Sequence, residues 1–289
     1  MIEEEASKAD IVYHWANADH TPSAAAIIRG LAKRQASTAA FLIHTSGTLI
    51  LGWASIREKH FGETRGKVYD DWNDIDQLIN LPDDAAHRHV DKVVLAASRQ
   101  FPGKIKTAIV CPPIIYGKGK GPGNQRSVQV YKSAEAFLRS GQAFMVGKGE
   151  NHWHHVHVVD LARLYLLLGE AAAAGGSPAT WNDEGYYLAE NGMIAWGDIM
   201  RALGKEAHKQ GFLPSAEVKQ FSVEEANKVK PFPTISTGTD SRGVSIRAKE
   251  LLGWKPREQA LLDEIPTIVT DEAKALGLVK GHAEKVTEE

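Results

Sequence analysis

The sequence predicts an α/β protein built around a parallel sheet. Short apolar strand patterns alternate with helical patterns along the first 180 residues, which is typical of parallel strands joined by helical crossovers. The stretch 105–111 is largely apolar and runs into Pro112 and Pro113. Since proline cannot donate to a strand ladder, this pattern predicts an inner strand that ends there. Beyond residues 171–178 the composition changes to short helices and loops, which predicts a smaller second lobe.

The expected elements follow one another closely. A strand near residues 10–16 precedes a helix over about 23–33, whose apolar residues recur at helical spacing. After a second strand at 38–43, the stretch 57–86 is polar and irregular. The next helix carries a core stripe of Val90, Val93, Val94 and Ala97. Then come the strand 105–111, the Gly-rich loop 117–124, a helix near 127–140, a strand at 155–159, a helix at 160–170, a strand at 185–189 and, from about Lys280, a charged end expected to fray.

The composition is that of an ordinary water-soluble protein, with 43% hydrophobic and 24% charged residues among 289. A net charge of −2 gives no electrostatic footprint for nucleic acid or an anionic membrane. No apolar run reaches transmembrane length, and the first ten residues are too acidic and polar for a signal peptide. The single cysteine, Cys111, fits a reducing compartment. We therefore predict a cytoplasmic protein with neither a nucleic-acid nor a membrane partner.

Five motifs occur in an order that resembles one known family. They are Val12–Ala16, the strand end His44–Thr48, the loop Pro112–Gly117, the segment His155–Ala162 and the element Leu252-Gly253-Trp254-Lys255-Pro256. Together they cover nearly the whole chain and resemble the extended short-chain dehydrogenase/reductase family, in its NAD-dependent epimerase/dehydratase branch. The resemblance implies a Rossmann-type sheet in residues 1–180, with 118–155 partly crossing to a substrate lobe in residues 181–289.

The resemblance also implies NAD or NADP as cofactor and a small carbonyl, alcohol or sugar-like metabolite as substrate. The chain starts at what resembles the family's fourth strand. The first strand and its Gly-rich turn, which bring backbone N–H groups to the pyrophosphate, are not found, and the loop 117–123 fits neither G-x-G-x-x-G nor the P-loop. We predict an N-terminally truncated sheet, natural or caused by a misplaced start, whose bare edge favours a homodimer. The expected cofactor contacts are Ala16, Asn17, Lys92, Pro113, Ile114 and Ile115.

The helix with the valine stripe resembles the family's Tyr-x-x-x-Lys helix. Lys92 matches the lysine, but Arg88 takes the place of the tyrosine, and an arginine stays protonated near neutral pH. Ser46 and Thr48 resemble the strand-end hydroxyl that polarises a carbonyl, and the register between them stays open. His89 is the nearby side chain that can shuttle protons at physiological pH. The expected catalytic residues are therefore Ser46, Thr48, Lys92 and His89.

The cleft of such a protein would hold the substrate against cationic and aromatic groups. The planar fork of Arg88 suits an anionic group. Arg126 and Arg242 could hold phosphates of a nucleotide-sugar-like substrate, or they are scattered surface cations. Of the histidines in 152–157, a strand would place His155 and His157 on one face without further ligands, so we predict no metal site. The expected substrate contacts are Arg88, Tyr116, Arg126, Trp153, His155 and Arg242.

Two functions remain open at this point. The first is an enzyme of oxidoreductase or epimerase type with altered acid/base chemistry, which Ser46, Thr48 and Lys92 favour. The second is a catalytically silent or non-redox member that binds a ligand as a sensor or scaffold. Arg88 and the missing phosphate turn favour the second. Cofactor binding followed by turnover would separate the two.

Overall fold

The computed structural model describes residues 1–279, and its main feature is a four-stranded parallel sheet. The strand order is β1-β2-β4-β8, so each strand is added on the same side of the previous one. All three neighbouring pairs are parallel. The predicted α/β fold with a Rossmann-type sheet is confirmed. The four strands are β1 (Ile11–His14), β2 (Ala40–Thr45), β4 (Ile105–Cys111) and β8 (Tyr186–Leu188).

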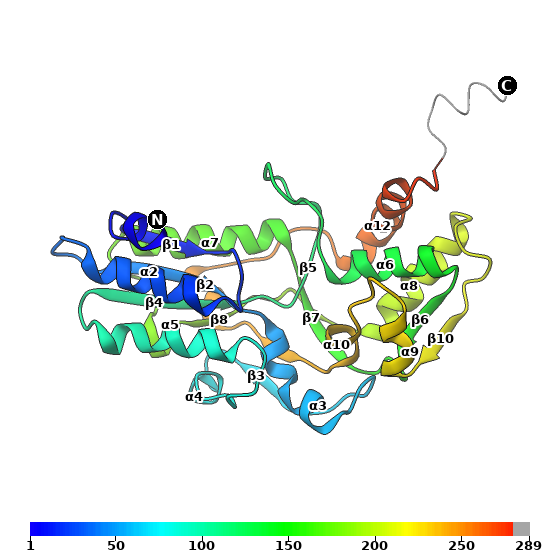
Figure 1. The fold of residues 1–289 in the computed structure, drawn as a ribbon, viewed down its shortest axis with the longest axis horizontal. Coiled ribbons are helices and arrows are strands. Elements are labelled where there is room, and N and C mark those ends of the chain that lie inside the picture. The colour runs from blue at the N-terminus through cyan, green and yellow to red at the C-terminus, as the bar shows by residue number, and fades with distance from the viewer. Residues whose placement is uncertain (280–289) are drawn as a thin grey trace.

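Helices cover both faces of this sheet, as Figure 1 shows. On one face α2 (Thr21–Lys33) and α5 (Arg88–Gln100) share a core with Leu42. On the other, α7 (Val158–Ala173) shares a core with Ile43. Since successive strand residues point to opposite faces, a strand covered on both sides has to be apolar throughout.

The outer edge of the sheet is formed by β1. Within residues 1–279, β1 pairs with β2 alone. The short helix α1 (Ile2–Ala6) packs on α2 at Gly30, where an added Cβ would lie 2.3 Å from the Glu3 carbonyl oxygen. Beside β1 the side chains of Trp15 and Leu166 are 61% and 60% exposed. The edge therefore carries an uncovered apolar surface.

The smaller lobe lies at the other end of the elongated molecule (Figure 1). Its core contains stacked phenylalanines, among them Phe144 and Phe221 with ring centroids 4.5 Å apart. Strands β6 and β10 pair in parallel beneath the helices. The lobe consists of α6 (Gln129–Ser140), β6 (Ala143–Val146), α8 (Trp196–Lys209), β10 (Val218–Phe221), α9 (Val223–Lys228), α10 (Thr234–Gly238) and α12 (Leu261–Ala275).

Short strands and turns join the two lobes. Asp71 ties together segments of the larger lobe: its carboxylate accepts the backbone N–H groups of Leu188 at 2.9 Å, Ile246 at 2.7 Å and Arg247 at 2.8 Å. The connections between the lobes include β5 (Ile114–Tyr116), β7 (His152–His157) and β9 (Met193–Ala195) in one sheet, and β3 (Val68–Asp70) with β11 (Arg242–Val244) in another. The remaining elements are η1 (Thr48–Gly52), α3 (Trp53–Glu58), α4 (Ile75–Leu78), η2 (Asn182–Glu184) and α11 (Arg247–Leu252).

The element boundaries differ from the sequence-based expectation in a few places. The strand expected at 155–159 is β7, which begins and ends earlier, and α7 starts at Val158. The last strand of the main sheet, β8, lies beyond the expected boundary at residue 180. The end expected to fray from Lys280 lies outside the described residues. Among the described helices, none is both long and apolar enough to cross a membrane.

Candidate active site

A cleft of about 510 Å³ opens at the carboxyl ends of β1 and β4. Trp15 and Ala16, which come directly after β1, line one wall of the cleft. Pro113, which comes after β4, lines another. The Gly-rich loop after β5 lines a further side with Gly119 and Gln125. Ligands of open parallel sheets bind at this edge, so the cleft is the first candidate for a binding site.

The expected cofactor contacts are distributed around this cleft. Ala16, Pro113 and Ile115 line it. Asn17 is exposed in the same loop as Ala16, while Ile114 is fully buried in the core of the smaller lobe. The Pro-rich loop therefore presents one side chain to the cleft and one to the core, as alternating residues of β5 must.

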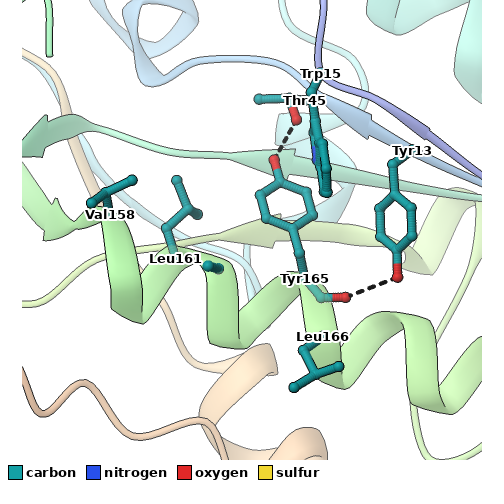
Figure 2. A pocket seen from close by; sticks show the side chains of 8 residues that line it. Tyr13, Trp15, Thr45, Val158, Leu161, Tyr165 and Leu166 are labelled. Atoms are coloured by element: carbon teal, nitrogen blue, oxygen red, sulfur yellow. Dashed lines mark hydrogen bonds between the residues drawn. The ribbon is translucent and has the colours of Figure 1, made fainter. Parts of the chain in front are cut away.

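An apolar groove of about 480 Å³ runs beside the cleft along α7, and Figure 2 shows its lining. The rings of Tyr13 and Trp15 lie 4.9 Å apart between centroids, and the Trp15 and Tyr165 rings meet edge to face at 5.3 Å. The Tyr165 hydroxyl bonds Thr45, and the Tyr13 hydroxyl donates to the Tyr165 carbonyl oxygen at 3.3 Å. Trp15 and Val158 line both the groove and the cleft, so the two are continuous.

His87 stands just before α5 and reaches the end of β2. Its backbone is left-handed, with φ of 63°, and its Nδ1 lies 2.8 Å from a carboxylate oxygen of Asp19 in the β1–α2 loop. An added Cβ at Gly47 would lie 3.0 Å from His87 Nε2. The carboxylate thus fixes one ring nitrogen and leaves the other beside Gly47, the residue after Ser46 at the strand end. An imidazole held in this way is suited to proton transfer.

One turn further along α5, Asp91 is fully buried beneath the strand ends. Its Oδ2 accepts the hydroxyls of Ser46 at 3.0 Å and Tyr186 at 3.2 Å. The Tyr186 hydroxyl also lies 3.6 Å from Cys111 Sγ. The other carboxylate oxygen, Oδ1, has no hydrogen-bond partner among the described residues and lies 3.6 Å from His44 Nε2.

Burial dominates the titration of this cluster. It raises the pKa of Asp91 to about 6, against the lowering effect of the Ser46 hydroxyl and of the His87 charge. It lowers the pKa of His44 to about 3 and raises that of the Cys111 thiol well above its usual range. The cluster is therefore poised to change charge at Asp91, rather than at the imidazole or the thiol.

The structure separates the two strand-end hydroxyls that the sequence left open. Ser46 faces α5 and bonds Asp91. Thr48 begins η1 and donates its backbone N–H to the Pro112 carbonyl at 3.0 Å, while its Oγ1 is buried without a partner among residues 1–279. Ser46 is thus the hydroxyl that belongs to the polar cluster.

The other site residues expected from α5 are Lys92, His89 and Arg88. Lys92 points outward, and its ammonium bonds Asp83 at 2.8 Å. His89 is exposed, with Nε2 3.0 Å from the Asp19 carbonyl oxygen. Arg88 is buried, and its Nε and Nη1 have no partner in the described part of the chain. The two residues that face the sheet are His87 and Asp91. They are also four apart, and each lies one residue before a member of the expected pair, Arg88 and Lys92.

The remaining expected substrate contacts are mostly engaged within the protein. The Tyr116 hydroxyl is buried and donates to the Gln259 carbonyl at 2.8 Å, and the Trp153 indole donates to Thr239 at 2.8 Å. Arg126 lines the cleft but is bound by the carboxylates of Glu135 and Glu272.

Two further expected contacts lie between the lobes. Arg242 pairs with Asp240 at 3.0 Å. His155 is half-buried, and burial lowers its pKa to about 4. Within residues 1–279 no group of three or more His, Cys, Asp or Glu side chains is arranged to hold a metal ion.

Comparison with known proteins identifies the family. Residues 2–183 match the model of the NAD dependent epimerase/dehydratase family. The chain belongs to this family. Among curated relatives, the oxidase ucsJ of Acremonium sp is 32% identical over 285 residues, covering 96% of this chain and 82% of that protein. An uncharacterized protein of Schizosaccharomyces pombe is 27% identical over 154 residues, covering 53% of this chain and 45% of its own length.

Solved structures of the family share the fold at low sequence identity. UDP-glucose 4-epimerase of Thermotoga maritima, solved with UDP-glucose, is 16% identical with a TM-score of 0.59, covering 95% of this chain and 82% of that one. The dTDP-glucose 4,6-dehydratase of Streptomyces venezuelae, solved with NAD, is 14% identical with a TM-score of 0.59, covering 96% and 78%. The family resemblance inferred from the motifs is confirmed.

The cleft fits one end of the family's dinucleotide. Its walls at Trp15, Pro113 and Val158 are apolar and lie at the strand ends, which suits a flat ring system. Within residues 1–279, no Gly-rich turn leads from a strand of the main sheet into a helix at this edge. The residues present therefore suit the ring end, and they lack the usual cradle for the diphosphate.

The sequence-based interpretation missed His87, Asp91, Asp19 and His44. One signal was available: Asp91 falls on the same helical face as Val90 and Val94, and a carboxylate within a core stripe is unusual. The contact between His87 and Asp19 joins residues 68 apart in the chain, so no local pattern could reveal it.

Proposed function

We propose that this chain is an NAD- or NADP-dependent enzyme that interconverts an alcohol and a carbonyl group on a small metabolite, by oxidoreductase or epimerase-type chemistry. The observation that carries the proposal is the His87–Asp19 pair at the strand ends, in a protein of the epimerase/dehydratase family. When bound, the dinucleotide supplies or accepts the hydride. The protein must then supply or accept the proton.

His87 is the proposed acid and base. Asp19 accepts a hydrogen bond from the Nδ1–H group and so fixes the tautomer in which Nε2 is free to take a proton from a substrate hydroxyl. The same nitrogen, once protonated, can return the proton to a carbonyl oxygen. An arginine at position 88 cannot do this, so the neighbouring imidazole takes over the work that a tyrosine does elsewhere in the family.

Ser46 is the proposed hydrogen-bonding partner of the substrate oxygen. It follows the end of β2 beside Gly47, and its hydroxyl is held by Asp91. A hydroxyl that donates at the place where charge develops on an oxygen stabilises the transition state, so the Ser46 proton has to turn from Asp91 to the substrate oxygen. Thr48, Lys92 and His89 stay predictions for supporting roles.

The proposed ligands occupy the cleft. Of the residues that the sequence predicted, Ala16, Asn17, Pro113 and Ile115 would contact the nicotinamide end, whereas the Ile114 side chain faces the core. A small alcohol, carbonyl or sugar-like substrate would lie toward the smaller lobe, near Arg126 and His155. The solved neighbours named with UDP-glucose make a sugar nucleotide one candidate class. Cytoplasmic location, N-terminal truncation and a homodimer stay predictions, to be checked by cell fractionation, by the mass of the native protein and by light scattering.

The test has two steps. NADH and NADPH are titrated against the full chain by nucleotide fluorescence, and turnover is then measured on a panel of sugar nucleotides, alcohols and carbonyls. We expect His87→Gln to lower turnover by about 10²–10⁴-fold, the usual worth of a positioned acid/base, while cofactor affinity stays within a few-fold. His60→Gln is the matched control, because His60 has weak contacts of 3.7 and 3.8 Å to Glu58 and Glu63.

One observation favours a second function. Since the described residues lack the usual diphosphate cradle, the cleft could serve a ligand without redox chemistry, as a sensor or scaffold. Binding of a small metabolite with no turnover, and no effect of His87→Gln on that binding, would support the second function. Absence of any NAD(P)H binding would refute the first.

A further inference from the structure

Two buried histidines meet behind the strand ends, and the proposed function does not use them. His14 on β1 and His44 on β2 lie opposite one another in register, with their Nδ1 atoms 2.8 Å apart. Their exposed fractions are 5% and 0%. Two N–H groups would collide at this distance and two lone pairs would repel, so the contact holds a single proton. The tautomer of one ring therefore dictates that of the other.

Each ring has a second contact on its Nε2 atom. His14 Nε2 lies 2.9 Å from Ser23 Oγ, which also lies 2.8 Å from the carbonyl oxygen of the exposed His20. His44 Nε2 lies 3.6 Å from Asp91 Oδ1. Hydrogen-bond contacts join the surface turn at His20 to His44, and a gap of 3.6 Å, longer than a hydrogen bond, separates His44 Nε2 from Asp91 Oδ1 in the candidate active site. We call this series of side chains the relay, and it consists of Ser23, His14, His44 and Asp91.

With Asp91 ionised, every proton of the relay has an acceptor once His44 and Asp91 approach by a few tenths of an ångström to close the 3.6 Å gap. Ser23 donates to His14 Nε2. His14 donates from Nδ1 to His44, whose Nε2 donates in turn to Asp91.

With one proton added and the same gap closed, each hydrogen bond of the relay runs in the opposite sense. Asp91 Oδ1 now donates to His44 Nε2, and His44 donates from Nδ1 to His14. His14 donates from Nε2 to Ser23, whose own proton turns to the His20 carbonyl. The proton enters at Ser23 and emerges on Asp91. Both imidazoles change tautomer, and neither becomes a cation.

We propose that the relay positions the Ser46 hydroxyl, by setting whether Asp91 holds it as an anion or as a neutral acid. This inference rests on the proposed function of Ser46. An ionised Asp91 binds the hydroxyl through a charge-assisted hydrogen bond, about twice as strong as a neutral one. A protonated Asp91 binds it weakly and leaves it free to donate to a ligand oxygen. Ser46 is then the contact, and the relay residues are positioning residues.

The surroundings of the relay place both states within reach of neutral pH. Burial raises the pKa of Asp91 to about 6 and lowers the pKa values of His44 and His14, so the added proton rests on the carboxyl group. The titratable and charged groups that face the relay are His20 beside α2, His87 just before α5, Arg88 of α5, Cys111 of β4 and Tyr186 of β8.

Nitrogen-15 NMR of histidine-labelled protein tests this inference without ligand or turnover. In the wild-type chain, we expect one of the two facing Nδ1 atoms to be protonated at every pH, with a scalar coupling across the N–H···N bond. As pH falls through about 6, where Asp91 titrates, His44 should gain its proton at Nδ1 and His14 at Nε2, at a common midpoint. Separate midpoints, or no change of tautomer, would overturn the relay.

Asp91→Asn supplies the matching variant. An asparagine cannot titrate, so both rings should stay in one tautomer across the same pH range. Asp198→Asn is the control, because Asp198 is an exposed carboxylate paired with Arg201 in the smaller lobe. A tautomer change that persists in Asp91→Asn would contradict the inference. If that variant fails to fold, the wild-type titration still decides the matter.

Turnover then links the relay to Ser46. With rising pH, wild-type kcat/KM should fall through the midpoint seen by NMR, whereas in Asp91→Asn this limb of the profile should disappear. A purely structural carboxyl group would change stability and leave the profile in place, which would refute the positioning role. A tautomer change without any turnover would instead count against the proposed function alone.

Discussion

Asp71 and Asp91 are two buried carboxylates with contrasting surroundings. Burial raises the pKa of each to about 6. Asp71 is bound by three backbone N–H groups from β8 and the start of α11, which cannot turn away. Asp91 is bound by two hydroxyls and faces an imidazole, all of which can reorient. A buried charge with fixed donors ties a fold together, whereas one with rotatable donors can take part in proton movement.

The largest effect is expected at Asp71, the carboxylate whose hydrogen-bond donors are fixed. Asp71→Ala should lower the free energy of unfolding by about 3 kcal/mol or more, because three buried N–H groups lose their acceptor. Asp91→Ala should cost less, since the Ser46 and Tyr186 hydroxyls can turn to other acceptors. Urea unfolding of the two variants at one pH compares them. Equal losses would erase the distinction between fixed and rotatable donors.

The second prediction concerns pH and stability. The folded-state pKa of Asp91 lies above its usual value of 3.8, so its contribution to stability is present at low pH and is lost as pH rises through about 6. The shift corresponds to about 3 kcal/mol. Asp91→Asn should therefore gain stability relative to wild type as pH rises from about 4 to about 7.

Denaturant midpoints at the two pH values measure this gain. Part of the wild-type pH dependence should remain in the variant, because Asp71 titrates in the same range. A variant that loses stability relative to wild type at the higher pH would show that the Asp91 charge is well stabilised by its neighbours.

The smallest effect is expected at the outward face of α5. Lys92→Gln removes an exposed ion pair with Asp83, which should change the free energy of unfolding by about 0–1 kcal/mol. Because Lys92 points outward toward Asp83, its replacement should change turnover little. A loss comparable to that of His87→Gln would instead support the role that the family resemblance gives to Lys92. Thermal unfolding and kcat/KM of the two variants, measured side by side, make this comparison.

The sequence predicted the fold well because apolar periodicity reflects burial directly. The run at 105–111 had to be an inner strand, and the stripe of Val90, Val94 and Ala97 had to face the sheet. The motifs likewise located the cleft at Ala16 and Pro113. These features depend on residues that are near one another in the chain.

The polar part of the site was harder to predict, because its contacts join distant segments. A shift of one residue on α5 exchanges Lys92, which faces solvent, for Asp91, which is buried. The left-handed backbone of His87, which directs its ring toward the strand end, leaves no mark in the sequence. Arg126 is neutralised by Glu272, 146 residues away. Charge pairing at such separations follows from the tertiary fold.

Cys111 gives this protein a built-in reporter of its own opening. Its thiol is inaccessible, and burial raises its pKa, so an alkylating reagent can attack only when the sheet parts near Tyr186. Since the chain has one cysteine, the rate at which the protein's mass rises under native conditions would report how often the sheet opens at this position. The rate at which the sheet opens beneath the strand ends can thus be measured without introducing a new cysteine or label into the chain.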